Sequence, residues 1–381
     1  MHNYHLINLL KNDIDISMIS VFDELNSDYL KKIDIKHENV KIPFEFIFKI
    51  CYRFNIFIKY ISILKDSLIS KQMYIANYKI NSSIIEFMDI HSESYYFLKK
   101  KKYMDKELVV IRSHTPWSLL KNYYSKIEKK YVDQAKIFKR ESFCFQACDV
   151  ITTPSNDLKK QLIKLFNINE EKINVLPNII DTKHFSPSTN NNKKNSFVIL
   201  HVGRFDKSKG VETLIKSFIE LAKVYDNIEL VNVGKTNYRT ISKYRNWLQE
   251  KSLNKRVNFK NFINYENLPK FYHNADVVIV PSEIYESFSY TAAQGMSCGK
   301  IVIGSKIGGI PETLNYGKSG ILFEPGNAIS LIKNIKKVYL KKVDIELMQN
   351  NARKHILDNF SFDALKQKYF DFYSRQLKLK K

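Results

Sequence analysis

The sequence predicts an α/β protein of two domains, each built on a parallel sheet. Short runs rich in valine and isoleucine alternate with amphipathic stretches of helical length, which is the pattern of repeated strand–helix–strand units. A polar stretch without periodicity, at 187–196, divides the chain into halves of similar size and is typical of a linker. Hydrophobic residues make up 44% of the 381 residues, which is enough for two packed cores and excludes a disordered chain.

The predicted strands are the apolar runs that recur along both halves. They are short and β-branched, and the amphipathic stretches between many of them supply the crossover helices that a parallel sheet requires. In chain order the clearest runs are DISMISVF, SIIEFMDI, ELVVIRSH, DVITTPS, INVLPNII, FVILHVG, IELVNVG, DVVIVPS and KIVIGS.

The chain is strongly basic, with a formal net charge of +22. Such an excess attracts nucleic acid, a phospholipid surface or phosphorylated ligands, although a low-GC genome that fills surfaces with lysine gives the same charge. Basic residues gather among aromatic ones at 99–140, where docking on an anionic membrane and a solvated helical face are the alternatives. The sequence contains no RNA- or DNA-binding motif, so we expect no nucleic-acid partner.

Cysteine usage and the N-terminus both indicate a cytoplasmic protein. The four cysteines show neither metal-ligand spacing nor the spacing of a disulfide framework, which fits a reducing compartment. The first residues lack the basic segment and apolar run of a signal peptide. We therefore expect a cytoplasmic location, and the inner face of the cytoplasmic membrane if the basic stretch docks there.

A candidate anion site follows the predicted strand FVILHV at 197–202. Gly203 lets backbone approach a ligand closely, and Arg204 and Lys209 follow in a turn before the next helix. Two cations at the carboxyl end of a strand are suited to neutralise a diphosphate, because ligands of open α/β sheets bind at that edge. Taken alone, the same pattern also fits two solvated cations on a loop.

A second candidate segment follows the strand DVVIVPS. Glu286 lies in the loop after it, and a helix of small residues then begins, whose first amide groups are unpaired donors for sugar hydroxyls or phosphate oxygens. Gln294, two helical turns further on, is expected to face the same way, and the next strand leads to a pair of glycines. The candidate ligand-binding residues of this segment are Ser287, Phe288, Ser289, Tyr290, Gln294, Gly308 and Gly309.

The order of these motifs resembles the retaining family-four glycosyltransferases of the GT-B fold, over roughly residues 140–335. The motifs are GRFDKSKGVETLIKSF, VNFKNFINYENLPKFYHNADVVIVPS, ESFSYTAAQGMSCGKIVIGSKIGGIPETL and SGILFEPGN. The resemblance implies two Rossmann-like domains that face each other across a cleft. It also implies that Arg204 and Lys209 bind the donor diphosphate and that Glu286 contacts the transferred sugar. The second Glu of the E-x7-E motif, which grips the ribose in similar enzymes, is Gln294 here.

The same resemblance covers the N-terminal half more weakly. Similar enzymes have an H-T-P or H-T-S sequence whose histidine contacts the reacting sugar or the acceptor, which is His114 here; a loop histidine without a role is the alternative. Glu141 matches a family glutamate and is interpreted as chiefly structural. Met1–Leu6 resembles the helix that follows the first strand and glycine-rich loop of the family, so we expect the N-terminal domain to lack that strand.

The expected domains are an acceptor-side domain at 1–186, a linker at 187–196, a nucleotide-sugar domain at 197–355 and a helix at 356–381 that crosses back to the first domain. The resemblance implies metal- and cofactor-independent, retaining transfer of a sugar from a nucleotide-diphosphate sugar to a glycan or polyprenyl-linked acceptor, in surface polysaccharide synthesis. Arg204, Lys209, Glu286 and His114 are the expected catalytic residues. A non-catalytic binding or scaffolding subunit of the same fold is the alternative, motivated by the expected absence of the first strand and by Gln294.

Overall fold

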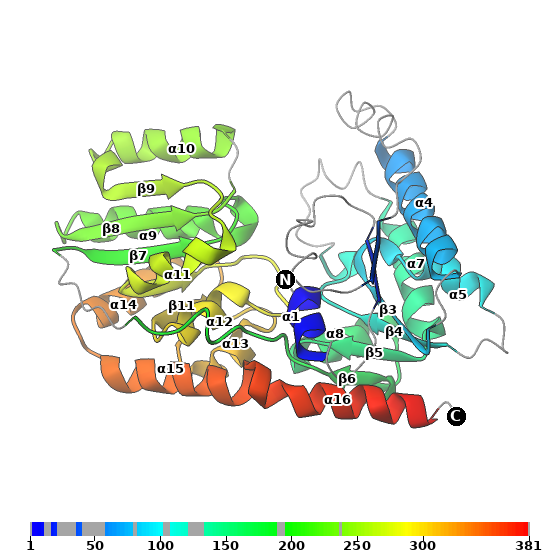
Figure 1. The fold of residues 1–381 in the computed structure, drawn as a ribbon. Helices are drawn as coiled ribbons and strands as arrows, with labels where there is room; N and C mark the ends of the chain where they lie inside the picture. The colour runs from blue at the N-terminus through cyan, green and yellow to red at the C-terminus, as the bar shows by residue number, and fades with distance from the viewer. Residues whose placement is uncertain are drawn as a thin grey trace. The chain divides into compact units, whose positions relative to one another are not determined.

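The structure is a computed structural model that describes residues 2–10, 17–20, 36–39, 58–78, 82–101, 107–120, 133–188, 195–235 and 238–379. The chain forms two compact units, one of Met1–Pro177 with Lys366–Lys381 and one of Asn178–Leu365. Both contain a parallel sheet with helices packed on it, as the sequence predicts (Figure 1). Within the described ranges no helix is long and apolar enough to cross a lipid bilayer.

The first unit is built on a four-stranded parallel sheet in the order β3-β4-β5-β6. These strands coincide with four of the predicted apolar runs, and a separate parallel pair, β1 and β2, precedes them. The elements are α1 (His2–Leu10), β1 (Ser17–Ser20), β2 (Lys36–Asn39), α4 (Ile58–Tyr78), β3 (Ile84–Met88), η1 (Ile90–Ser92), α5 (Tyr95–Lys100), β4 (Leu108–Arg112), η2 (Trp117–Leu120), α7 (Gln134–Ala147), β5 (Val150–Thr153), α8 (Asn156–Phe166), η3 (Glu170–Lys172) and β6 (Ile173–Val175).

The second unit is built on a six-stranded parallel sheet in the order β12-β11-β10-β7-β8-β9. Counted within the unit, this is the doubly wound order 6-5-4-1-2-3. The elements are β7 (Phe197–Val202), η4 (Lys207–Lys209), α9 (Val211–Ala222), β8 (Ile228–Val233), α10 (Tyr238–Gln249), η5 (Asn254–Arg256), β9 (Val257–Lys260), η6 (Tyr265–Asn267), α11 (Leu268–His273), β10 (Val277–Val280), α12 (Tyr290–Ser297), β11 (Ile301–Ser305), α13 (Ile310–Thr313), η7 (Asn315–Gly317), β12 (Ile321–Phe323), α14 (Ala328–Tyr339) and α15 (Ile345–Phe360).

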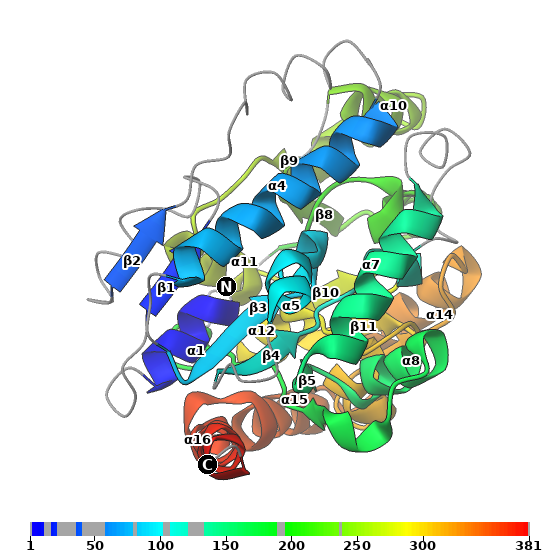
Figure 2. The same ribbon diagram turned by 90° about the vertical axis from the view of Figure 1, so that its right-hand side faces the viewer.

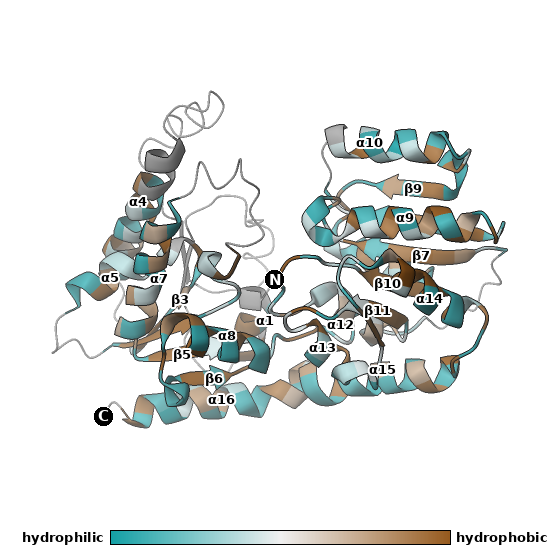
Figure 3. Ribbon diagram, turned by 180° about the vertical axis from the view of Figure 1, so that it is seen from behind, coloured by the Kyte–Doolittle hydropathy of each residue, from teal (hydrophilic) through white to brown (hydrophobic). Residues whose placement is uncertain are grey.

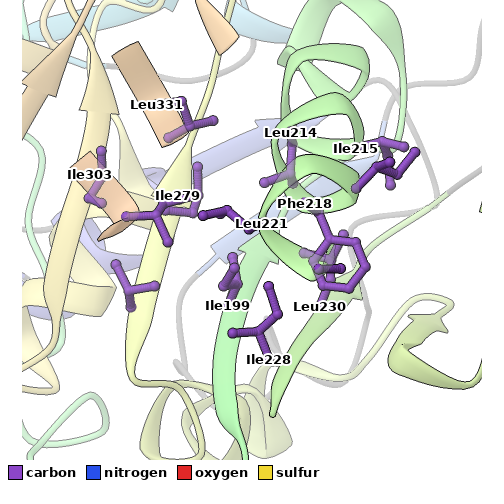
Figure 4. Close-up of a cluster of buried hydrophobic side chains, with 14 of the residues drawn as sticks. Ile199, Leu214, Ile215, Phe218, Leu221, Ile228, Leu230, Ile279, Ile303 and Leu331 are labelled. Carbon is purple, nitrogen blue, oxygen red and sulfur yellow. The ribbon is translucent and has the colours of Figure 1, made fainter. Parts of the chain in front are cut away.

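The core of the second unit lies between α9 and the sheet. Figure 4 shows Leu214 and Phe218 of α9 directed toward side chains of the neighbouring strands, including Ile199 of β7. These residues are at most 1% exposed. Figure 3 shows that β7 and β10 are mostly apolar whereas α9 alternates, because both faces of the sheet are covered but only one face of the helix is.

The division between the units lies at Pro177–Asn178 and not at the predicted linker. Phe185 is fully buried in a core cluster of the second unit, and its carbonyl oxygen accepts hydrogen bonds from Ser297 Oγ at 2.6 Å and Arg353 at 3.0 Å. Residues 178–186 therefore belong to the second unit, because burial fixes them there. Of the predicted linker, residues 189–194 lie outside the described residues.

The last helix, α16 (Phe362–Leu379), begins in the second unit and belongs to the first unit from Lys366 onward. Two tyrosines attach it to the first unit: Tyr369 donates to the carbonyl oxygen of Pro177 at 2.8 Å, and Tyr373 donates to Glu86 Oε2 at 2.7 Å. The predicted single helix at 356–381 is therefore divided between two helices. Its first residues are the end of α15, which continues to Phe360 within the second unit, and α16 follows.

We predict that Phe218→Ala lowers the free energy of unfolding by about 3–5 kcal/mol, because it removes a buried ring and leaves a cavity between α9 and the sheet. Val224→Ala, whose side chain is 63% exposed just after the same helix, is the matched control and is expected to change it by less than about 0.5 kcal/mol. Denaturant unfolding measures both. Equal effects of the two variants would contradict the described core.

Candidate functional site

The candidate site of the second unit lies where β7 and β10 run side by side. The two strands are parallel neighbours, with Ile199 opposite Val277, and the strand order reverses between them. Ligands of doubly wound sheets bind at such a reversal, outside the carboxyl ends of the strands. Gly203 and Arg204 follow β7 at that edge, and Pro281 and Ser282 follow β10. The sheet topology therefore brings together the two segments that the sequence singled out.

A glycine seats the turn after β7 against the segment after β10. Gly210 has a φ of +69°, and a Cβ added there would lie 1.7 Å from the carbonyl oxygen of Pro281. Only glycine allows this approach. The amide of Glu283 donates to the carbonyl oxygen of Ser208 at 3.0 Å, which fixes the contact from the other side. Lys209 is thereby held over the end of β10.

Lys209 forms an ion pair with Glu286, with 2.6 Å between Lys209 Nζ and Glu286 Oε1. The two side chains are 25% and 13% exposed, so the pair is partly shielded from water. Ser282 Oγ also donates to Glu286 Oε1. Arg204 is more open, with 62% of its side chain exposed and its Nε 3.4 Å from Asp206 Oδ2. The structure therefore pairs one predicted cation, Lys209, with the predicted glutamate, while Arg204 lies in the same turn beside Asp206.

The start of α12 lies at the same edge of the sheet. Ser289 caps the helix and accepts a hydrogen bond from the amide of Ala292 at 3.3 Å, and Thr291 Oγ1 donates to the carbonyl oxygen of Val202 at 2.9 Å. The second bond attaches the first turn of the helix to the end of β7. A helix start carries a partial positive charge and favours anions. Ser287, Phe288 and Ser289 are at most 9% exposed, so any ligand contact there falls to the backbone and to Tyr290.

The glycine pair after β11 encloses the backbone of Glu286. A Cβ added at Gly308 would lie 2.2 Å from the carbonyl oxygen of Glu286, and the φ of Gly308 is +56°. The amide of Gly309 donates to that same oxygen at 2.7 Å. Both predicted glycines thus lie beside Glu286, and at Gly308 the lack of a side chain permits the close approach.

The structure places Gln294 differently from the other candidates. Its side chain is 3% exposed, and its Oε1 accepts a hydrogen bond from the Tyr272 hydroxyl at 2.9 Å. The carbonyl oxygen of Gln294 is thus directed at α11, and the predicted donor contact of this side chain stays a prediction. Sequence reasoning missed the Tyr272 contact, because the eight-residue spacing from Glu286 to Gln294 does not reveal a partner on another helix.

A buried histidine behind the turn was also missed. His201 of β7 is 2% exposed, and its Nδ1 lies 2.6 Å from Asn232 Oδ1 of β8. Burial lowers the pKa of His201 to about 4, so the imidazole is neutral. A Cβ added at Gly203 would lie 3.4 Å from a ring carbon of His201, so the ring supports that turn. The one available signal was a histidine within an otherwise apolar strand.

His114 lies in the first unit, just after β4. Its backbone amide donates to Asp89 Oδ2 at 3.0 Å, as does Ser113 Oγ at 2.7 Å. Burial and, next, the charge of Arg112 lower the pKa of His114 to about 3. The imidazole is therefore neutral and acts as a hydrogen-bonding group, not as a cation.

Glu141, interpreted from the sequence as structural, is 3% exposed and accepts hydrogen bonds from the amides of Trp117 at 2.7 Å and Ser118 at 3.0 Å. It therefore caps η2, which follows His114 closely in the chain.

The part of the chain that the structure describes holds no group of three or more His, Cys, Asp or Glu side chains placed to bind a metal ion.

Comparison with known proteins gives two family matches that together cover residues 83–355. Residues 182–355 match the glycosyl transferases group 1, and residues 83–184 match glycosyltransferase family 4. The chain is 29% identical over 240 residues to the uncharacterized glycosyltransferase MJ1607 of Methanocaldococcus jannaschii, covering 60% of each chain. It is 29% identical over 237 residues to the lipopolysaccharide 1,2-N-acetylglucosaminetransferase of Salmonella typhimurium, covering 57% of this chain and 62% of that one. The match thus spans about three fifths of each relative.

Solved structures match nearly the whole chain. Sucrose-phosphate synthase from Thermosynechococcus elongatus gives a TM-score of 0.79 at 19% identity, covering 99% of this chain and 92% of that one. HepE from Anabaena, in complex with UDP, gives a TM-score of 0.75 at 18% identity, covering 97% of this chain and 95% of that one. At such identities the likeness shows the fold, which is that of the GT-B glycosyltransferases. With this fold and the two family matches, the chain belongs to the group 1, family 4 glycosyltransferases.

Proposed function

We propose that the chain transfers a sugar, with retention of configuration and without a metal ion, from a nucleotide-diphosphate sugar to a glycan or polyprenyl-linked acceptor in surface polysaccharide synthesis. The observation that carries the proposal is the Lys209–Glu286 pair at the meeting point of β7, β10 and α12. The first candidate for the nucleotide is UDP, because a structural relative is solved in complex with it. The acceptor class is proposed from the lipopolysaccharide transferase among the relatives.

The site supplies the charges that this chemistry needs. When the bond between sugar and diphosphate breaks, negative charge develops on the leaving diphosphate while the sugar becomes oxocarbenium-like. Lys209 and Arg204 are the proposed cations for that charge, and the start of α12 adds oriented amide groups. Glu286, held by Ser282, is placed to accept hydrogen bonds from hydroxyls of the sugar. His114, being neutral, is proposed to hydrogen-bond the reacting sugar or the acceptor.

We predict that Arg204→Ala and Lys209→Ala each lower kcat/KM by about 100- to 1000-fold, because each removes a cation that stabilises the leaving diphosphate. The measurement is nucleotide release with the best donor from a panel of UDP-, GDP- and ADP-sugars. Lys223→Ala removes an exposed lysine at the far end of α9 and is the control, with no expected change. An undiminished rate in both site variants would reject the proposal. Absence of any transfer or donor hydrolysis by the wild-type chain would favour a non-catalytic subunit.

We predict that excess EDTA leaves the transfer rate unchanged and that the product keeps the anomeric configuration of the donor. The proposed cations Arg204 and Lys209 take the place of a metal ion at the leaving group. Rates with and without EDTA and the anomeric proton coupling of the fresh product measure the two properties. Loss of activity in EDTA that Mg²⁺ or Mn²⁺ restores, or an inverted product, would contradict the respective part of the proposal.

An anionic membrane is the proposed surface partner of the first unit, because the proposed acceptor class includes polyprenyl-linked glycans. Helices α5 and α7 lie side by side (Figure 2). They expose several lysines and Phe143, whose ring centroid lies 5.3 Å from that of Tyr95. This α5–α7 face consists of Lys99, Lys100, Lys136, Lys139 and Phe143. The remainder of the basic stretch, at 102–106 and 121–132, lies outside the described residues.

We predict that Lys136→Gln/Lys139→Gln weakens binding to vesicles with phosphatidylserine about 30-fold, since each lysine near an anionic surface contributes about 1 kcal/mol. Lys251→Gln/Lys255→Gln makes the same charge change on exposed lysines of the second unit and is the control. Vesicle sedimentation measures both. Equal binding by all three proteins, or equal binding to vesicles of phosphatidylcholine alone, would contradict a role for the α5–α7 face.

A further inference from the structure

The segment that carries His114 is held at both ends by buried carboxylates from two other elements. Asp89 follows β3 and binds the start of the segment, through Ser113 Oγ and the amide of His114. Glu141 comes from α7 and binds the end of the segment, through the amides of Trp117 and Ser118. We call Ser113–Ser118 the His114 segment. Its four anchoring hydrogen bonds are 2.7 to 3.0 Å long.

Both carboxylates are held in an unfavourable environment. Asp89 is 5% exposed and Glu141 is 3% exposed. Burial, as the largest cause, raises the pKa of Asp89 to about 6 and that of Glu141 to about 7. Within the described residues neither forms an ion pair with lysine or arginine. Burying a carboxylate without a counter-ion destabilises the fold unless hydrogen bonds offset the lost hydration. The His114 segment donates such bonds to both carboxylates.

The local geometry leaves little freedom for the segment. Pro116 fixes one backbone angle in its middle, and both of its ends are tied to packed elements, β3 and α7. The two carboxylates also line one cavity of about 10 Å³, together with Ser92, Ser94 and Cys144, so they lie on the same side of the segment. Asp89 and Glu141 therefore hold the backbone from which the His114 imidazole extends.

We propose that Asp89 and Glu141 are positioning residues for His114, a proposal that rests on the catalytic contact assigned to His114 in the proposed function. Reacting groups must be placed to within about 1 Å, and a misplacement of that size costs about 100-fold in rate. Weakening either anchor shifts the imidazole. It therefore slows the chemical step without altering the donor site, all of whose residues belong to the second unit.

The test is a double-mutant cycle on the full chain with Glu141→Gln, His114→Ala and the combined variant. The side-chain amide that Glu141→Gln introduces retains one acceptor but turns a donor toward the second backbone N–H, so one anchoring bond is lost. We expect Glu141→Gln to lower kcat about 10- to 100-fold while the donor KM stays within about twofold. The combined variant should be no slower than His114→Ala alone, because the anchor acts through the histidine. Fully multiplied effects would overturn the proposal.

Two further variants separate structural loss from positioning. Asp89→Asn tests the other anchor and is expected to repeat the kcat effect and the non-additivity with His114→Ala. Glu86→Gln alters a buried carboxyl of the same sheet that binds Tyr373 and not the His114 segment. It is expected to lower the melting temperature but not kcat. A kcat loss in Glu86→Gln equal to that in Glu141→Gln would overturn the proposal, as would an unchanged kcat in both anchor variants.

The outcomes also distinguish this proposal from the proposed function. If His114→Ala slows transfer and the anchor variants do not, positioning alone fails. If His114→Ala retains full activity while Arg204→Ala and Lys209→Ala lose it, both positioning and the role of His114 fail, but the donor site stands. If the two cation variants keep full activity, the proposed function itself fails.

Discussion

The pairing of β7 with β10 is the constraint on which the candidate site depends. The ends of these strands are almost 80 residues apart in the sequence, yet the doubly wound strand order makes them neighbours. Gly210 then allows the turn after β7 to lie on Pro281, and this contact delivers Lys209 to Glu286 at 2.6 Å. Thr291 attaches the start of α12 to the same strand end. Cations, carboxylate and helix start meet because one pair of strands is adjacent.

The ion pair between Lys209 and Glu286 gives the site a balanced charge. In the proposed function, a donor diphosphate competes with Glu286 for Lys209, whereas Arg204 is 62% exposed and pairs with Asp206. Ser282 and Gly309 hold the side chain and the backbone of Glu286 in place. The flexible lysine is therefore the partner that moves. In the proposed function, donor binding is therefore an exchange of partners, in which Lys209 turns to the phosphate and Glu286 becomes available to the sugar.

The sequence was sufficient for nine of the described strands, but not for β2, β9 and β12, and for the segments at the ends of β7 and β10. Apolar runs such as FVILHV and DVVIVPS mark buried parallel strands, and glycines and cations at their ends predict a site because strand ends share an edge. Gln294 shows the limit, since only the packed structure reveals that Tyr272 takes its carbonyl oxygen. Asp89 was equally hidden, because its importance comes from a hydrogen bond to a segment 25 residues away. The boundary between the units lies before the polar stretch that composition indicated, because the burial of Phe185 assigns residues 178–186 to the second unit.

A structure of the chain with UDP bound tests this exchange of partners, with the distance from Lys209 Nζ to the nearest phosphate oxygen as the measured quantity. We expect this distance to be about 3 Å and Glu286 to have separated from Lys209. We also expect the phosphates to lie at the start of α12. A UDP molecule bound elsewhere, or one bound while the Lys209–Glu286 pair remains closed at 2.6 Å, would contradict the exchange.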